Sequence, residues 1–337
     1  MAKKKYYLVL DTETCTLPFA EELAHGDSEL KKKIAIAKPL VYDIGWTICD
    51  RKGKIYDKKQ FLIAETFSVP SVFNTAYYAE KRPIYIDMLS KGLTSIKPWD
   101  EAMETLINDM KKVDAVGAFN AMFDFKKAIP FTESYIRNLY SCNFAYWEKA
   151  QYDSCQRILD NNPIERDKEF DNENFEFRKE KYPLFDIWGL ATKYLLNNQS
   201  YKKDCIMRGQ ITSSGVYFKT SAEVAYQYLN KKPDFIESHT ALDDAEIETF
   251  ILSKLEKVCG VKTGLTYFPF RDLGYTYEFC KRHKNPNLDE CRAVYKALKK
   301  YCDMKLAECE KTGQAPTNYV NQLQKKMEEI VKYVRGE

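Results

Sequence analysis

The sequence predicts an α/β protein with a mixed β-sheet flanked by helices, followed by a helical C-terminal extension. Three observations support this fold class. Short β-branched and aromatic segments come first, apolar residues then recur at helical spacing, and strand-like and helix-like segments alternate up to about residue 260. A chain of 337 residues with 45% hydrophobic residues can form two structural units, or one unit with insertions.

Three strands are predicted near the N-terminus. Residues 6–10 (YYLVL) are aromatic and aliphatic and run directly into the acids of DTET. Residues 41–50 and 54–65 flank a turn at 51–53 that contains Gly53, which is a hairpin signal. Together the three segments predict an antiparallel meander.

The next elements begin with a helix at 99–112, whose apolar residues share one face, and a short apolar strand at 114–119. Asn120 is expected to cap a helix that continues until Pro130 interferes with it. The charged stretch 151–182 has few aliphatic residues, and we expect a surface insertion there.

Three further helices are predicted, two of them from capping signals. Asp186 is the expected N-cap of a helix at 187–195, and Thr220 with Glu223 forms a capping box for a helix at 222–229. A longer helix, 241–257, follows His239.

The predicted first domain covers residues 1–260, with insertions near 15–40 and 140–182. Residues 261–337 form a basic helical extension, with helices near 289–311 and 317–334. From residue 271 onward the chain has 14 Lys and Arg against 10 Asp and Glu. The net charge of this segment is therefore +4.

Composition excludes some functional classes. The net charge of +3 creates no global field that would argue for nucleic acid or membrane binding. No apolar run approaches the ~20 residues of a membrane helix, so we expect a cytoplasmic protein without membrane association. Ten cysteines without paired spacing favour reduced thiols. A zinc site formed by Cys280, His283, Cys291 and Cys302 is the alternative to ordinary buried thiols.

Two acidic motifs mark a candidate metal site. Asp11 and Glu13 lie two residues apart at a strand end, so both carboxylates should point to one face, about 7 Å apart along the chain. Carboxylate oxygens are the ligands that Mg²⁺ and Mn²⁺ prefer, although a pair of surface acids is the simpler alternative. Asp124 is expected near a helix N-terminus, where the helix dipole alone would favour it.

The stretch SHTALDDAEIE, residues 238–248, contains one of only three histidines. In a continuous helix, at ~100° per residue, His239 and Asp244 would lie about 140° apart. They can share a site if His239 lies in the loop before the helix. A lone histidine is usually structural, but a base that loses its proton near pH 7 suits the activation of water beside metals. His239 is therefore the candidate base and Asp244 a candidate metal ligand.

The segments LVLDTET, FNAMFD and HTALDD together resemble the three motifs of the DnaQ-like, or DEDDh, 3′→5′ exonuclease family. A histidine stands five residues before the last aspartate, as in the histidine subtype, and softer features resemble phage-encoded members. The resemblance implies an RNase H-like fold. The five motif positions fall on Asp11, Glu13, Asp124, His239 and Asp244.

This resemblance implies a two-metal-ion phosphodiesterase that uses two Mg²⁺ or Mn²⁺ ions and releases nucleoside 5′-monophosphates. Asp11, Glu13 and Asp244 would hold the first metal, Asp124 would support the second together with Asp11, and His239 would take the proton. A glycine common after the first family motif is absent here. The resemblance implies that Thr12 and Thr14 line the sugar pocket and that Leu17 packs on the terminal base. Asn120 is a further candidate substrate-binding residue.

Single-stranded DNA is the favoured substrate, because the abundant tyrosines and phenylalanines suit stacking on unpaired bases. An exoribonuclease of the same fold is an alternative, since the motif residues recognise a phosphodiester and not the sugar. A non-catalytic module that binds nucleic-acid ends or associates with a polymerase is a third possibility. The basic C-terminal extension either docks DNA or a replication or polymerase partner, or packs on the core as a stabilising helical pair. Lys126 and Lys127 could contact phosphates, but exposed helix charges are the simpler interpretation.

Overall fold

The computed structural model describes residues 5–18, 23, 26, 39–140, 173–212, 216–261, 264, 288–313, 315 and 318–335. Most of the two predicted insertions, together with Cys280 and His283, lies outside these residues. The chain divides into two compact units. The first unit comprises Met1–Trp188 and Ile236–Leu265, and the second comprises Gly189–Phe235 and Thr266–Glu337. The helical C-terminal segment thus groups with residues 189–235.

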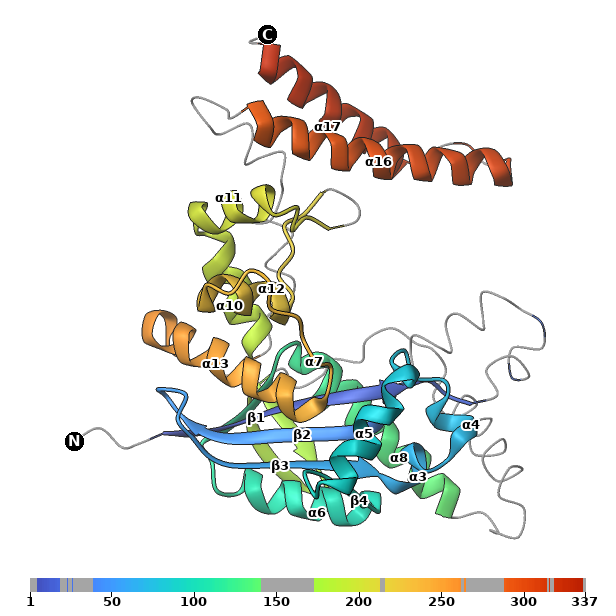
Figure 1. Ribbon diagram of the computed structural model, residues 1–337, viewed down its shortest axis with the longest axis vertical. Helices are drawn as coiled ribbons and strands as arrows, with labels where there is room; N and C mark the ends of the chain where they lie inside the picture. The colour runs from blue at the N-terminus through green and yellow to red at the C-terminus, as the bar shows by residue number, and fades with distance from the viewer. Residues whose placement is uncertain are drawn as a thin grey trace. The chain divides into compact units, whose positions relative to one another are not determined.

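The first unit is built on a seven-stranded mixed sheet with the order β4-β3-β2-β1-β5-β7-β6 (Figure 1). Neighbouring strands β1, β2 and β3 pair antiparallel, which confirms the predicted meander. Strand β5 runs parallel to β1, β7 parallel to β5, and β4 parallel to β3, while β6 is antiparallel to β7. The strands are β1 (Tyr6–Cys15), β2 (Leu40–Asp50), β3 (Ile55–Ile63), β4 (Ser95–Lys97), β5 (Ala115–Ala118), β6 (Asn174–Phe177) and β7 (Glu180–Asp186).

Helices cover both faces of this sheet. On β2, Gly45 lies against the backbone of α13, whereas the indole of the next residue, Trp46, donates to Asp109 of α6 on the opposite face. The predicted α/β fold is therefore confirmed. The helices of this unit are α3 (Ala64–Phe67), α4 (Pro70–Phe73), η1 (Ala79–Lys81), α5 (Arg82–Ser90), α6 (Trp99–Met110), α7 (Ala121–Phe123), η2 (Asp124–Ala128), α8 (Ile129–Tyr140) and α13 (Ala241–Cys259), with the start of α10 (Ile187–Leu196).

Two local predictions near the site are corrected. Strand β1 does not end at Leu10 but continues to Cys15, so Asp11 and Glu13 lie inside the strand. The helix after β5 does not end at Pro130, and the side chain of Asn120 does not cap it. Instead, a π-helical turn, η2, leads into α8, where proline is the second residue and its missing N–H costs little.

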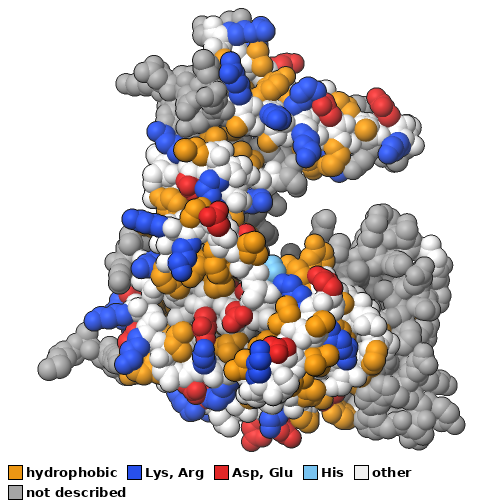
Figure 2. All heavy atoms as spheres, viewed as in Figure 1, with side chains coloured by type: hydrophobic (Ala, Val, Ile, Leu, Met, Phe, Trp, Pro, Cys, Tyr) orange, Lys and Arg blue, Asp and Glu red, His pale blue; other side chains and the backbone are white. Residues whose placement is uncertain are grey.

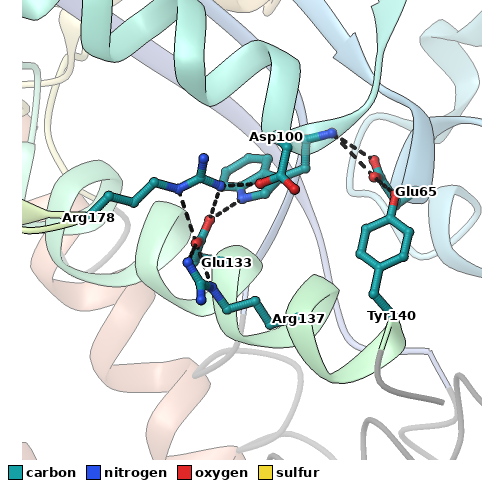
Figure 3. Close-up of polar contacts among 7 residues, drawn as sticks. Glu65, Asp100, Glu133, Arg137, Tyr140 and Arg178 are labelled. Atoms are coloured by element: carbon teal, nitrogen blue, oxygen red, sulfur yellow. Dashed lines mark hydrogen bonds and ion pairs between the residues drawn. The ribbon is translucent and has the colours of Figure 1, made fainter.

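A buried polar network joins α8 to its neighbours (Figure 3). The carboxylate of Glu133 accepts from the indole of Trp99 at 2.6 Å and from Nη2 of Arg178, in the β6–β7 turn, at 2.8 Å. Arg137, one helical turn further along α8, donates to the same carboxylate. The carboxylate of Glu65 accepts from the Trp99 backbone N–H at 3.1 Å, so this tryptophan is held at both its backbone and its side chain.

The second unit is helical, with the rest of α10, α11 (Gln199–Met207), α12 (Ala222–Asn230), α16 (Leu288–Thr312) and α17 (Asn318–Arg335). Both predicted C-terminal helices are present. The N-cap of α12 is Ser221, whose hydroxyl accepts from the Val224 N–H, so the predicted cap at Thr220 was wrong by one residue.

The cysteines of α16 bear on the alternative zinc site. Cys291 and Cys302 are both buried on this helix, eleven residues apart. At 1.5 Å per residue they are about 16 Å apart, too far to bind one zinc ion together.

Among the described residues, no helix has the combination of length and apolar composition that crossing a bilayer requires.

Candidate active site

The neighbouring strands β1 and β2 place three carboxylates on one face of the sheet. Asp11 and Glu13 alternate along β1 and therefore project to the same face, as predicted. In the antiparallel register Asp11 lies opposite Gly45, and Glu13 lies opposite Asp43. Asp43 was not predicted from the sequence. The signal that could have revealed it is an acid within an otherwise apolar strand, two residues before a glycine.

Asp43 and Gly45 position the start of α13. The Asp43 carboxylate is buried, accepts two hydrogen bonds from Nε2 of Gln60, and accepts a third from the Ala241 N–H at 3.0 Å. A Cβ atom at Gly45 would lie 2.3 Å from the Leu242 backbone nitrogen. Only glycine allows β2 and the first turn of α13 to approach this closely. Asp244 lies in that same turn.

His239 lies in the loop just before α13, as predicted, with a left-handed φ of 53°. Its Nδ1 atom is 3.8 Å from Oδ2 of Asp244 and 3.9 Å from Oε2 of Glu237. Potential ligand atoms of Glu13, His239 and Asp244 all lie within 4.8 Å of one another. The loop conformation therefore brings together three of the five motif residues from chain segments more than 200 residues apart.

Asp124 is buried in the π-helical turn after β5. Its Oδ1 atom accepts from the hydroxyl of Thr12 at 2.6 Å. Burial, followed by the charges of Glu248, Asp124 and Asp244, raises the pKa of Asp11, so these acids lie close enough to interact. Four acidic motif residues and His239 thus converge on the same region of the first unit.

Burial and mutual repulsion strongly perturb these acids. Burial is the largest cause that raises the Glu13 pKa to about 9, followed by the charges of Asp244 and Asp43. Burial likewise raises the pKa values of Asp124 and Asp244 to about 7 each, and that of Asp11 lies well above its usual value. Without a cation, this arrangement favours protonated carboxyl groups.

Lys81 is a cation beside this cluster. Its ammonium group lowers the pKa values of Glu13 and Asp244, although burial and neighbouring acids outweigh this effect. The same ammonium donates to the Ser238 carbonyl and lies 4.4 Å from the ring centroid of Tyr78. Sequence analysis missed Lys81 because no local pattern links residue 81 to residue 238.

Two further acids hold the loop that leads to Asp124. Glu248, one turn after Asp244 on α13, is buried and accepts from the Phe119 N–H at 3.0 Å. Asp186 accepts from the Asn120 N–H at 3.2 Å and from the Trp188 N–H at 3.0 Å, which confirms its predicted capping role. Burial, and next the charge of Asp124, raise the pKa of Glu248 well above its usual value. The signal for Glu248 was its i+4 spacing from Asp244.

The candidate substrate residues do not form one surface. Thr12 is buried with its hydroxyl committed to Asp124, and Leu17 is fully buried in the hydrophobic core, which does not fit their expected contacts with sugar and base. Thr14 is partly buried and Asn120 is exposed. Lys126 donates to the Asn174 carbonyl, and Lys127 is exposed.

The donor set fits a hard divalent cation. The Oδ1 atom of Asp244 is buried and finds no hydrogen-bond donor among the described residues, and a carboxylate oxygen in that state is stabilised by a cation. An oxygen of Glu13 lies close enough to Asp244 to share one ion with it, and a ring nitrogen of His239 lies beside both carboxylates. On the visible face of the molecule, acidic and basic side chains are interspersed, so the negative charge that would attract a cation is local (Figure 2).

Searches of protein-family models, curated proteins and solved structures found no match to this chain.

Proposed function

We propose that the protein is a metal-dependent 3′→5′ exonuclease of the DnaQ-like, DEDDh type, with an RNase H-like fold. One observation carries the proposal. Asp11, Glu13, Asp124, Asp244 and His239 come from three distant segments and converge on one largely buried acidic cluster with the histidine beside it. Buried acids that repel one another destabilise a fold, so their convergence favours a catalytic or metal-binding role over a structural one.

The sheet supports the fold assignment. An antiparallel meander of β1, β2 and β3 continues into parallel strands β5 and β7, an arrangement compatible with an RNase H-like protein. The acids lie on β1, in the π-helical turn η2 that follows β5 and α7, and at the start of α13. A site at the end of a parallel strand and at a helix start is a common position for binding anionic ligands and metals in α/β proteins.

Asp11, Glu13, Asp124 and Asp244 are the residues that would hold two Mg²⁺ or Mn²⁺ ions. When bound, such ions stabilise negative charge on the attacking and leaving oxygens of a phosphodiester. Thr12 holds Asp124 in one orientation through its hydroxyl, and the Ala241 N–H holds Asp43 behind Glu13. Asp124 is therefore held in one orientation before any ligand arrives.

His239 is the proposed general base. Its Nδ1 atom faces the carboxylates of Asp244 and Glu237, which stabilise the imidazolium that forms when this ring takes the proton from the attacking water. Attack at the terminal phosphorus breaks the bond to the 3′ oxygen of the preceding nucleotide. That oxygen takes up a proton and becomes the new 3′ end, and a nucleoside 5′-monophosphate leaves.

The test is digestion of 5′-labelled and 3′-labelled single-stranded DNA and RNA oligonucleotides in Mg²⁺, Mn²⁺ or EDTA. We expect metal-dependent shortening from the 3′ end, faster on DNA, that is lost in Asp11→Asn and strongly slowed, to a measurable residual rate, in His239→Ala. Asp87→Asn is the matched control, because Asp87 is an exposed acid of α5 that pairs with Lys91. Faster cleavage of RNA would reassign the substrate to RNA.

Tight binding of labelled ends without cleavage in any metal would refute the proposed reaction. It would favour a module that binds nucleic-acid ends.

A further inference from the structure

The segment of η1 and α5 contacts the histidine loop in three ways. The ring of Tyr78 stacks on His239, with centroids 4.4 Å apart and planes 14° apart. The ammonium of Lys81 donates to the Ser238 carbonyl. The hydroxyl of Tyr85 donates to the His239 carbonyl at 3.4 Å. Backbone and side chain of this loop are thus held by a segment about 160 residues away.

The histidine conformation requires such support. His239 has a φ of 53°, and a non-glycine residue in the left-handed region is disfavoured by about 1–2 kcal/mol. Its side chain is also 28% exposed, so solvent would permit other rotamers. The contacts of Lys81 and Tyr85 hold the backbone but do not touch the imidazole. The only ring contact among those three is the stack with Tyr78.

The geometry of the stack selects one orientation of the imidazole. With parallel rings, Tyr78 covers a face of His239 and its hydroxyl lies 3.2 Å from Nε2. The Nδ1 edge then faces Asp244 and Glu237. Tyr78 is itself held, because Lys81 lies over its ring and the edge of Tyr77 packs against it at 4.8 Å between centroids. An imidazole turned over by 180° would lose the contact between Nε2 and the Tyr78 hydroxyl and would turn Nδ1 away from the acids.

We infer that Tyr78 is a positioning residue for the proton transfer at His239. Its aromatic ring fixes the plane of the imidazole, and its hydroxyl, 3.2 Å from Nε2, selects the orientation that directs Nδ1 at the acidic cluster. The kinetic part of this inference rests on the proposed exonuclease function. The structural part, the stack itself, does not.

Nuclear magnetic resonance tests the structural part without any activity. The chain has only three histidines, so a histidine-selective ¹H–¹³C spectrum contains few signals, and His239→Ala assigns the relevant one. Because a stacked aromatic ring shields protons above its face, we expect the His239 ring protons to shift downfield in Tyr78→Leu. In Tyr78→Phe they should stay near their wild-type positions. Tyr56→Leu is the matched control, since this partly exposed tyrosine of β3 packs on Tyr6 and not on the site.

Steady-state kinetics tests the functional part. We expect Tyr78→Leu to lower kcat about tenfold with KM nearly unchanged, which is the size expected for loss of one aromatic pair. Tyr78→Phe should lower kcat less than Tyr78→Leu does, because its ring is kept and only the hydroxyl contact to Nε2 is removed. In a His239→Ala background, Tyr78→Leu should cause no further loss.

The inference is overturned if the His239 signal does not move in folded Tyr78→Leu. It is also overturned if Tyr78→Leu is equally harmful with and without His239, or if KM alone rises, which would indicate a direct substrate contact. A wild-type protein without nuclease activity that still shows the shift would reject the proposed function while supporting the position of Tyr78. Circular dichroism of each variant identifies any that fails to fold, and Tyr78→Phe then carries the comparison.

Discussion

Gly45 provides the sharpest test of how the site is assembled. Replacing it by alanine adds one methyl group, which would lie 2.3 Å from the Leu242 nitrogen, 2.5 Å from the Ala241 carbonyl carbon and 2.6 Å from the Leu242 Cα atom. All three are backbone atoms of α13, so no flexible side chain can move aside.

The expected displacement follows from these distances. Non-bonded atoms are normally about 3.5 Å apart, so the first turn of α13 must move away from β2 by about 1 Å. The hydrogen bond from the Ala241 N–H to Asp43, now 3.0 Å, would lengthen beyond hydrogen-bonding range. Overpacking costs about 1–3 kcal/mol and a lost buried hydrogen bond about 1 kcal/mol, so Gly45→Ala should destabilise by about 2–4 kcal/mol.

The same movement would carry Asp244 and His239 away from Glu13. A misplacement of about 1 Å can reduce a catalytic rate about 100-fold, so we expect Gly45→Ala to lose most of its cleavage activity even where it is fully folded. Urea denaturation measures the stability, and oligonucleotide digestion well below the urea midpoint measures the rate.

Gly92→Ala is the matched control. Gly92 also lies in the first unit, has a φ of +65° and has open space around its missing Cβ atom. We expect a loss of about 1–2 kcal/mol from left-handed strain, with the cleavage rate unchanged. If Gly45→Ala unfolds at the wild-type urea concentration and cleaves at the wild-type rate, then the close approach of β2 to α13 does not position the site.

Three further predictions concern the charges of the first unit. Because burial raises the pKa of Glu13 to about 9 and that of Asp124 to about 7, the folded state binds more protons than the unfolded state between pH ~4 and ~9. The metal-free protein should therefore lose stability as pH rises through that window. A melting temperature in EDTA that is equal at pH 5 and pH 9 would contradict this expectation. Added Mg²⁺ should stabilise the protein most at the higher pH. Glu248→Gln keeps an oxygen acceptor for the Phe119 N–H and removes a buried ionisable group. We therefore expect a higher melting temperature in EDTA at pH 8 and weaker Mg²⁺ binding by calorimetry. An unchanged melting temperature would argue against the burial of that charge. Arg178→Ala removes one of the partners of the Glu133 carboxylate. Urea unfolding should show that the free energy of unfolding falls by about 1–3 kcal/mol, with no change in Mg²⁺ affinity. Wild-type stability would show that the network in Figure 3 contributes nothing measurable.

Local signals in the sequence predicted much of the fold. The meander, the helix after Pro98, the capping role of Asp186 and both C-terminal helices follow from periodicity and from residues next to one another in the chain. Errors arose where neighbouring turns compete. The π-helical turn after β5 allowed the chain to continue through Pro130, and Ser221 rather than Thr220 became the N-cap of α12.

The sequence by itself also determined the acidic centre, because spacing limits where side chains can point. Asp11 and Glu13 are two residues apart along a strand, and His239 and Asp244 lie on either side of a helix start. Only the tertiary structure revealed the groups that hold this centre in place. Asp43 bonds to a residue 198 positions away, Glu248 to one 129 positions away, and Lys81 to one 157 positions away.

Burial was likewise decided by the assembled fold. Thr12 and Leu17 belong to the first motif region, yet Thr12 is enclosed beside Asp124 and Leu17 within the core. A local pattern specifies which residues share a strand face or a helix face, because that depends on backbone geometry alone. Which distant surface covers that face, and how closely, depends on packing, and here a single missing Cβ atom at Gly45 sets that distance.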